Sequence, residues 1–357
     1  MKPENLAYPY GVPVISGLIK SRPEDFEVIE HLDFEPSEQG EHLFLLVEKT
    51  GLTTPQLIEI IARQHALHPR QIGYSGLKDR NALTRQWLSL HLPGRELPEK
   101  PRDGEGYRVL RAHRHYSKLR HGTHKSNFFR VTLRQVAGLE EVTREQLQAL
   151  ATRGMANYFG PQRFGREQDN VEQALKQLGN ARLKRSRRGI LLSSLRSYLF
   201  NQVLSRRISL GHWDQPLDGD VFMLRGSHSI FSEPLDQSLR QRFSMMDIAS
   251  TASLYGSGES RLAGEALQIE QRILAEHEEV TACLDRQAVR RQMRALRVAL
   301  DTFDYEHDPV AKTMRLQVSL PAGSYLTSLL AHFIAVSEPA QEAFRYRQNQ
   351  PSDGPSR

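Results

Sequence analysis

Residues 73–86 read GYSGLKDRNALTRQ and lie between two regular elements of the expected fold. An amphipathic pattern over residues 53–67 predicts a helix before it, and residues 86–92 are strand-like. Gly73 and Gly76 permit a tight, exposed turn between the two elements. The stretch is therefore expected to be a loop held by rigid neighbours, in an α+β arrangement, and such loops often carry catalytic groups.

The loop places one carboxylate among several cations. Asp79 is flanked by Lys78 and Arg80, and Arg85 follows a few residues later. Nearby cations favour the ionised form of a carboxyl group, which a nucleophile or a general base requires. The same pattern is typical of a salt-bridged turn, so local chemistry alone leaves both interpretations open.

Strand patterns surround this loop in the first part of the chain. Besides residues 86–92, strand-like segments cover residues 25–30, 41–49, 107–112 and 128–136. In the last of these, Phe129, Val131 and Leu133 share one face. A helix is expected from Thr143, where Gln146 would complete a capping box.

The pattern changes after residue 160 and changes back near residue 304. Helices are expected around residues 195–203, 262–277 and 286–300. Period-two alternation then returns over residues 304–320, with a turn at 307–309, and a last helix is expected over 324–335. Strand-rich sequence that stops and later resumes indicates a discontinuous domain with an insertion.

Composition narrows the class of protein. The 357 residues are enough for one large domain or two ordinary ones, and the formal net charge is +6. The single cysteine, Cys283, excludes an intramolecular disulfide and a thiolate metal cage, which fits a reducing compartment. We see neither a signal-peptide pattern nor an apolar run long enough for a membrane span, so a cytoplasmic protein is expected.

The cations gather in clusters that contain no acidic residue. Residues 108–125 and 182–188 form two clusters, and Arg286, Arg290, Arg291, Arg294 and Arg297 form a third at spacings that suggest one helical face. Charge runs are usually solvated faces, but three of them suit phosphate contacts. The histidines of the first cluster are not expected to bind metal, because the cations around them would repel it.

The opening loop resembles a family signature. Residues 76–86, GLKDRNALTRQ, resemble G-x-K-D-[KR]-x-A-x-T-x-Q of the TruD family, the tRNA pseudouridine synthases D. Four further family motifs follow the same order along the chain: KSRPEDFEV at 20–28, NFFR at 127–130, NYFGPQRFG at 157–165 and LPAGSY at 320–325. Together they cover most of the chain.

The resemblance implies an α+β fold. A pseudouridine-synthase catalytic domain, built on a mixed or antiparallel sheet with flanking helices, would comprise residues 1–153 and 303–346. A mainly helical α/β insertion domain would occupy residues 154–302. Residues 347–357 are expected to be a disordered tail.

The resemblance also implies an activity and its residues. The enzyme would isomerise uridine 13 in the D-arm of tRNA to pseudouridine, with no metal and no small-molecule cofactor. Asp79 corresponds to the family's catalytic aspartate and Lys20 to its electrostatic partner. Either attack on the sugar or removal of a ribose proton would suit one carboxylate, and the sequence does not choose.

Further positions are implied to contact the RNA. A flipped base needs an aromatic wall and a few hydrogen bonds, and Phe129 and Asn127 resemble the residues that provide them. Phe26 and Tyr325 resemble further substrate-binding residues, whereas Asn157 and Phe159 fit either the pocket or only the domain junction. The cations expected on the RNA backbone are Lys78, Arg80, Arg111, Arg114, Lys125, Lys184, Arg185 and Arg187.

Two other functions compete with this one. A non-catalytic RNA-binding or RNA-folding protein could retain the same pocket. A hydrolytic glycosidase or nuclease would need a second acid or a metal, and nothing in the sequence selects one. The expected partner is tRNA, bound by a monomer that does not associate with membranes.

Overall fold

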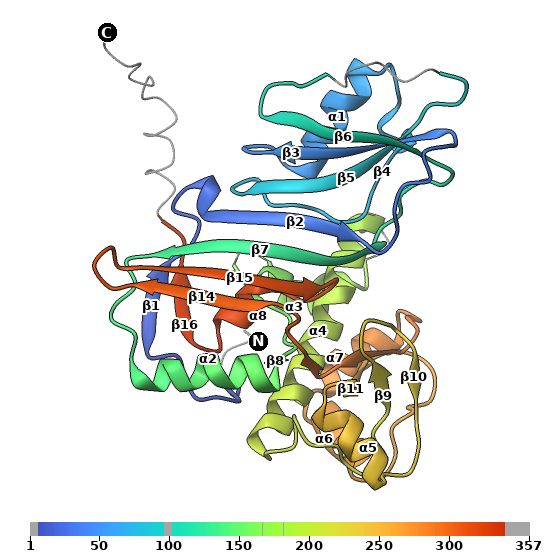
Figure 1. The fold of residues 1–357 in the computed structure, drawn as a ribbon. Helices are drawn as coiled ribbons and strands as arrows, with labels where there is room; N and C mark the ends of the chain where they lie inside the picture. Colours follow the sequence, from blue (N-terminus) through green and yellow to red (C-terminus); the bar gives the residue numbers. More distant parts are fainter. Residues whose placement is uncertain (1–5, 96–101, 166, 181, 340–357) are drawn as a thin grey trace. The chain divides into compact units, whose positions relative to one another are not determined.

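The computed structural model describes residues 6–95, 102–165, 167–180 and 182–339 (Figure 1). The chain divides by contact into two units. The sheet unit comprises Ile15–Glu140, Asp301–Ala322 and Ile334–Arg357, and the helical unit comprises Met1–Val14, Glu141–Leu300 and Gly323–Phe333. The tail expected at 347–357 lies outside the described residues. The expected catalytic and insertion domains, with their boundaries, remain a prediction.

The sheet unit is built on one ten-stranded mixed sheet. Seven strands run in the order β14-β15-β7-β2-β5-β3-β6, with β1, β4 and β16 joined off this path. The strands are β1 (Ile15–Leu18), β2 (Phe26–Leu32), β3 (His42–Lys49), β4 (Ile72–Tyr74), β5 (Leu83–His91), β6 (Tyr107–His115), β7 (His124–Arg134), β14 (Phe303–Asp308), β15 (Thr313–Pro321) and β16 (Ile334–Ser337). The β2–β5 and β1–β16 pairs are parallel and the others antiparallel, which confirms the expected α+β class.

One helix covers part of this sheet. Helix α1 (Thr54–Gln64) begins at a capping box formed by Thr53 and Gln56, with Pro55 in its first turn. Its Leu57, Ile58 and Ile61 pack against Leu43 and Leu45 of β3 and Leu88 and Leu90 of β5. This packing fixes the segment where β3 leads into α1, which we call the β3–α1 corner. The Asp79 loop contacts this corner.

The alternation expected along β7 is confirmed. Phe129, Val131 and Leu133 are all buried, and β7 lies between β2 and β15 in the sheet. The turn expected at 307–309 lies slightly later, at residues 309–312, because β14 continues to Asp308 and pairs with β15 as an antiparallel hairpin.

The helical unit is organised around one long helix, α4 (Arg185–Ser209), whose buried face includes Leu195, Leu199 and Phe200. The other helices are α2 (Glu141–Arg153), α3 (Asn170–Gln177), α5 (Gln237–Ser244), α6 (Gly264–Glu276), α7 (Glu278–Asp285) and α8 (Leu326–Leu330). The short strands are β8 (Met155–Ala156), β9 (Phe222–Leu224), β10 (Ile230–Phe231), β11 (Ile248–Leu254), β12 (Gln292–Ala295) and β13 (Arg297–Val298). No helix among the described residues is long and apolar enough to cross a membrane.

The helix expected over residues 286–300 is wrong. This segment forms β12, which pairs with β11, and β13, which pairs with β8. Its residues are good helix formers, but helix propensity is a weak preference that hydrogen bonding to an available strand edge overrides. The third arginine cluster therefore does not form one helical face.

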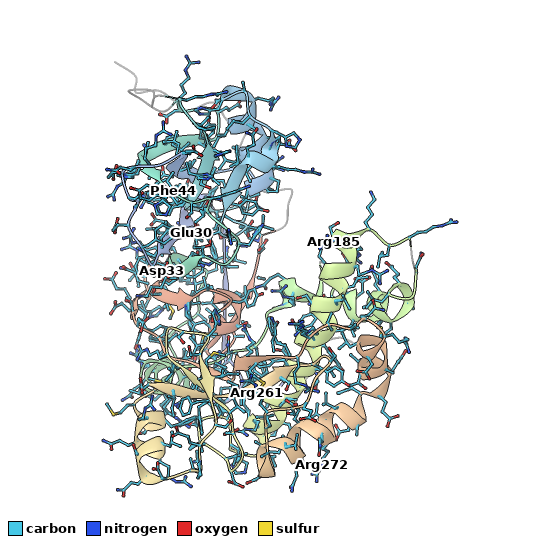
Figure 2. All side chains as sticks on the ribbon, turned by 90° about the vertical axis from the view of Figure 1, so that its right-hand side faces the viewer. Glu30, Asp33, Phe44, Arg185, Arg261 and Arg272 are labelled. Atoms are coloured by element: carbon cyan, nitrogen blue, oxygen red, sulfur yellow. The ribbon has the colours of Figure 1, made fainter. Side chains whose placement is uncertain are left out.

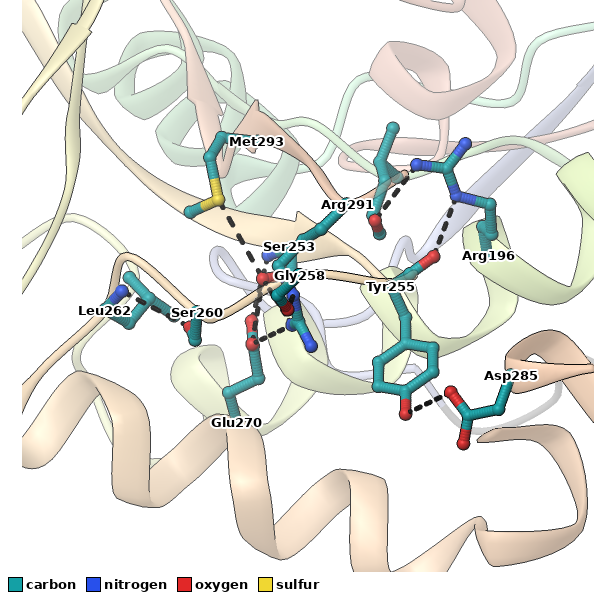
Figure 3. Close-up of polar contacts among 11 residues, drawn as sticks. Arg196, Ser253, Tyr255, Gly258, Ser260, Leu262, Glu270, Asp285, Arg291 and Met293 are labelled. Atoms are coloured by element: carbon teal, nitrogen blue, oxygen red, sulfur yellow. Dashed lines mark hydrogen bonds and ion pairs between the residues drawn. The ribbon is translucent and has the colours of Figure 1, made fainter. Parts of the chain in front are cut away.

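Several of those arginines bind within the protein instead. Arg291 donates to Glu270 and Ser253 at 3.1 Å each, and Ser253 also donates to Glu270 (Figure 3). Arg297 is buried, donates to the Phe243 carbonyl at 2.6 Å and lies over the Phe243 ring. Arg291 neutralises the buried Glu270, and Arg297 provides a hydrogen bond to a buried carbonyl, so neither side chain is available to phosphates.

Two smaller expectations about helix ends are also wrong. Helix α2 begins at Glu141, so Thr143 lies inside its first turn and forms no capping box with Gln146. The Gln146 amide instead donates to the carbonyls of Tyr10, Gly11 and Val12. The last helix ends at Leu330, and the chain continues into β16 because that segment completes a parallel ladder with β1.

Candidate active site

The Asp79 loop is anchored by a buried ion pair in the sheet unit. Lys78 donates its backbone N–H to the Thr54 hydroxyl at 2.9 Å, and its ammonium lies 2.5 Å from Glu30 Oε2. The side chains of Lys78 and Glu30 are 5% and 0% exposed, and Glu30 also accepts from the Trp87 amide. Figure 2 labels Glu30 among the side chains of the sheet unit. The loop is therefore fixed immediately before Asp79.

Replacing Lys78 with methionine should destabilise the protein by about 3–5 kcal/mol, because Glu30 would be left as an unpaired buried charge. Urea unfolding followed by circular dichroism measures this loss. The double variant Lys78→Met with Glu30→Gln should recover most of it, since no charge is then stranded. Equal losses in the single and double variants would contradict the account.

Asp79 is paired with Lys20, as the sequence resemblance implied. Lys20 Nζ lies 2.5 Å from Asp79 Oδ2, and the Asn81 amide donates to Asp79 Oδ1 at 3.1 Å. Burial acts to raise the pKa of Asp79, but Lys20, the Asn81 amide and the charge of Lys49 outweigh it and lower the pKa. Because the carboxylate is ionised and still 42% exposed, it can meet a substrate.

Lys20 is held in an unusual conformation. It follows β1 with a φ of 56°, in the left-handed region that residues with a Cβ seldom adopt. Its ammonium also binds Glu338 Oε1 at 2.9 Å and lies 5.0 Å from the centre of the Phe26 ring. Burial disfavours the charged lysine, yet Asp79 and Glu338 raise its pKa above the ordinary value, so Lys20 stays cationic.

An aromatic pair lies next to Lys20. The Phe26 and Phe129 rings meet edge to face with centroids 6.1 Å apart, on neighbouring strands β2 and β7. Asn127 occupies the same face of β7, two residues before Phe129. Its Oδ1 is buried and has no hydrogen-bond partner among the residues that the structure describes. A buried acceptor without a partner is costly, so Asn127 is a candidate for ligand recognition.

The remaining substrate-binding candidates come together in the helical unit. Phe159 lies 6.0 Å from Tyr325, measured between ring centroids, and Arg294 stacks on Phe159 at 4.0 Å. Arg163 donates to the Tyr325 hydroxyl. The Asn157 amide is occupied within the protein, because its Oδ1 accepts from Arg294 and its Nδ2 donates to the Ala295 carbonyl.

The cations expected on the RNA backbone divide into two groups. Five are exposed: Arg80, Arg111, Lys125, Lys184 and Arg185, the last labelled in Figure 2. The other three bind groups of the protein: the burial of Lys78 argues against its assignment to RNA, whereas Arg114 and Arg187 are half-buried and their assignment stays a prediction. Lys78 is paired with Glu30, Arg114 donates to the carbonyls of Gly40, Leu92 and Arg95, and Arg187 donates to Asn170 and Gln173.

The structure adds four residues that sequence reasoning did not select. Lys49 and Glu338 contact Asp79 and Lys20, respectively, and Arg163 and Arg294 line the Phe159 cluster. Arg163 stands inside the NYFGPQRFG motif, which could have singled it out. Arg294 was noted only as part of the third arginine cluster, and Lys49 and Glu338 carry no local signal. No group of three or more metal-ligating side chains occurs among the described residues.

Comparison with known proteins identifies the family. The profile of the family described as tRNA pseudouridine synthase D (TruD) matches residues 4–173 and 166–333. The chain belongs to the TruD family. A tRNA pseudouridine synthase D of Nitrosococcus oceani is 36% identical over 95% of this chain and 96% of its own length. One from Aeromonas salmonicida is 39% identical over 96% and 97%.

The fold agrees with a solved TruD structure. The TruD protein of Methanosarcina mazei matches 93% of this chain and 95% of its own, with a TM-score of 0.68 and 19% identity. At that identity the likeness establishes the fold alone. The TruD assignment rests on the sequence profile and the relatives, and the solved structure agrees with it in fold.

Proposed function

We propose that this TruD protein is a tRNA pseudouridine synthase that isomerises uridine 13 in the D-arm, with Asp79 as nucleophile or base. The observation that carries the proposal is the 2.5 Å pair between Lys20 and Asp79. The pair lies beside the Phe26–Phe129 rings, and the unpartnered Asn127 Oδ1 shares a strand face with Phe129. This set combines an ionised carboxylate, an aromatic surface and a polar group for one flipped base.

The reaction conserves every atom of the substrate. The bond between uracil N1 and ribose C1′ breaks, a bond between C5 and C1′ forms, C5 loses its proton and N1 gains one. Asp79 starts this sequence either by attacking the ribose or by removing a ribose proton. Both routes need an ionised carboxylate, and Lys20 keeps Asp79 in that form.

Hydrogen bonding explains how uracil would be held. Uracil presents N3–H as a donor between two carbonyl oxygens. The Asn127 amide can accept from N3–H through its Oδ1 and donate to one of these carbonyl oxygens through its Nδ2. The neighbouring Phe129 ring provides a face or edge for the base. The exposed cations Arg80, Arg111 and Lys125 would contact phosphates, and the enzyme is expected to act as a cytoplasmic monomer.

Pseudouridine mapping of cellular tRNA tests this proposal. Deleting the gene should remove pseudouridine at position 13 from its substrate tRNAs, and the wild-type gene should restore it. Asp79→Asn should not restore it. Persistence of the modification after deletion would overturn the assigned position, whereas restoration by Asp79→Asn would favour the non-catalytic RNA-binding function.

A further inference from the structure

Lys49 is a buried lysine that has no ion pair at hydrogen-bond distance among the described residues. It is the last residue of β3, and its side chain belongs to the fully buried set, at 1% exposure. Its ammonium donates to two backbone carbonyls, Leu52 O at 2.7 Å and Asp79 O at 2.8 Å. The neighbouring acid, Glu48, is engaged instead by Arg85 and Arg108.

Such a lysine costs stability. Burial of an ammonium away from a carboxylate disfavours its charged form, and here burial lowers the pKa of Lys49 to about 8. The Asp79 carboxylate favours the charge and Lys78 opposes it. A methionine would fill similar volume without the cost of a buried charge, but it would leave the Leu52 and Asp79 carbonyls without this donor. The buried charge therefore calls for an explanation other than stability.

The position of Lys49 next to Asp79 supplies such an explanation. The β3–α1 corner holds the catalytic loop at three places around Asp79. Thr54 accepts from the Lys78 amide, Gly51 exchanges hydrogen bonds with Arg80, and Lys49 binds the carbonyl of Asp79 itself. Only the last of these contacts places a positive charge against Asp79, and that charge lowers the pKa of the carboxyl group together with Lys20.

We propose that Lys49 is a positioning residue for the isomerisation: its ammonium fixes Asp79 through the backbone carbonyl and supplies a second positive charge facing the carboxylate. This inference rests on the proposed function. Lys20 reaches Asp79 from the second residue after β1, whereas Lys49 reaches it from the end of β3. The two lysines would hold one carboxylate from separate segments of the sheet unit.

Lys49→Met separates this role from a structural one. Turnover on tRNA should fall about a hundredfold, because the Asp79 carboxylate is misplaced and no longer has the positive charge of Lys49 nearby. KM should change little, because the RNA contacts remain. The urea midpoint should change little, since removal of a buried charge offsets the loss of the two hydrogen bonds to Leu52 O and Asp79 O. Lys312→Met, on an exposed turn between β14 and β15, is the matched control and should leave both measurements unchanged.

The pH profile isolates the charge from the hydrogen bonds. A neutral lysine amine can still donate to both carbonyls, so deprotonation removes only the charge. Wild-type turnover should therefore decline above a pH of about 8, and Lys49→Met should lack this decline. The groups facing Lys49 are Asp79 and Lys78 from the loop, with Thr84 and Tyr107 opposite it in the sheet. The Tyr107 hydroxyl is engaged by Gln64, and burial raises its pKa, which separates it from this range.

Three outcomes would overturn the inference. Unchanged turnover in Lys49→Met would remove the residue from the reaction. A fall in stability that accounts for the lost activity would make Lys49 merely structural. An alkaline decline that persists in Lys49→Met would show that its charge is not used. By contrast, the absence of any turnover in the wild-type protein would contradict the proposed function itself.

Discussion

Asp79→Asn should lower turnover on tRNA by about 10⁴-fold or more while RNA affinity stays near that of the wild type. Loss of a nucleophile or base that acts as part of a unit typically has effects of this size. The amide keeps the shape of the carboxylate but carries no charge, so it neither attacks the ribose nor takes its proton. Single-turnover kinetics and filter binding measure the two quantities.

A matched carboxylate-to-amide change controls for this variant. Asp33 is exposed on the sheet unit (Figure 2), and Asp33→Asn should behave as the wild type in both assays. Residual turnover within tenfold of the wild type in Asp79→Asn would contradict the assignment of Asp79. Parallel loss of RNA affinity and turnover would instead indicate that the change disrupts binding.

Lys20→Met should lower turnover by about 10²- to 10³-fold, the usual effect of removing one preorganised electrostatic contact. The acid limb of its pH profile should also move. Lys20 lowers the pKa of Asp79, so its removal raises that pKa and Asp79 becomes protonated at a higher pH. Because the proposed mechanism requires the ionised form, activity should be lost at a higher pH than in the wild type.

Lys20→Arg provides the control for charge. It retains a cation beside Asp79 and the same backbone requirement at φ 56°, so its acid limb should stay near that of the wild type. Its turnover should lie between those of the wild type and Lys20→Met, because the larger, planar guanidinium would hold Asp79 and Glu338 in a different geometry from the compact ammonium. An unmoved acid limb in Lys20→Met would exclude Lys20 from control of Asp79.

The fold was most predictable from the sequence where a local pattern of residues is enough to determine the local structure. The sequence predicted three features: the buried apolar run of β3, the alternation along β7 and the start of a helix at Pro55. Burial and local backbone rules determine all three. Residues 286–300 were misread for the opposite reason. Their helix-forming composition is local, whereas the partner strands β8 and β11 that convert them to β12 and β13 are distant in sequence.

The site was predictable in part for a similar reason. The Asp79 loop is continuous in sequence and matches a family motif, so one stretch was enough to select it. The sequence around Lys49 does not predict its hydrogen bond to the Asp79 carbonyl, because only the folded β3–α1 corner brings the two residues together. Lys78 was misassigned to RNA since its cationic neighbours are visible in the sequence but its buried partner Glu30 is not.

Tritium release tests the central claim most directly. Purified wild-type protein is mixed with a tRNA pool carrying tritium at uridine C5, with no added metal or cofactor. Formation of the C5–C1′ bond expels the C5 hydrogen, so the account predicts release of label to water in proportion to the substrate tRNA, and none with Asp79→Asn. Absence of release from every tRNA in the pool would contradict the account.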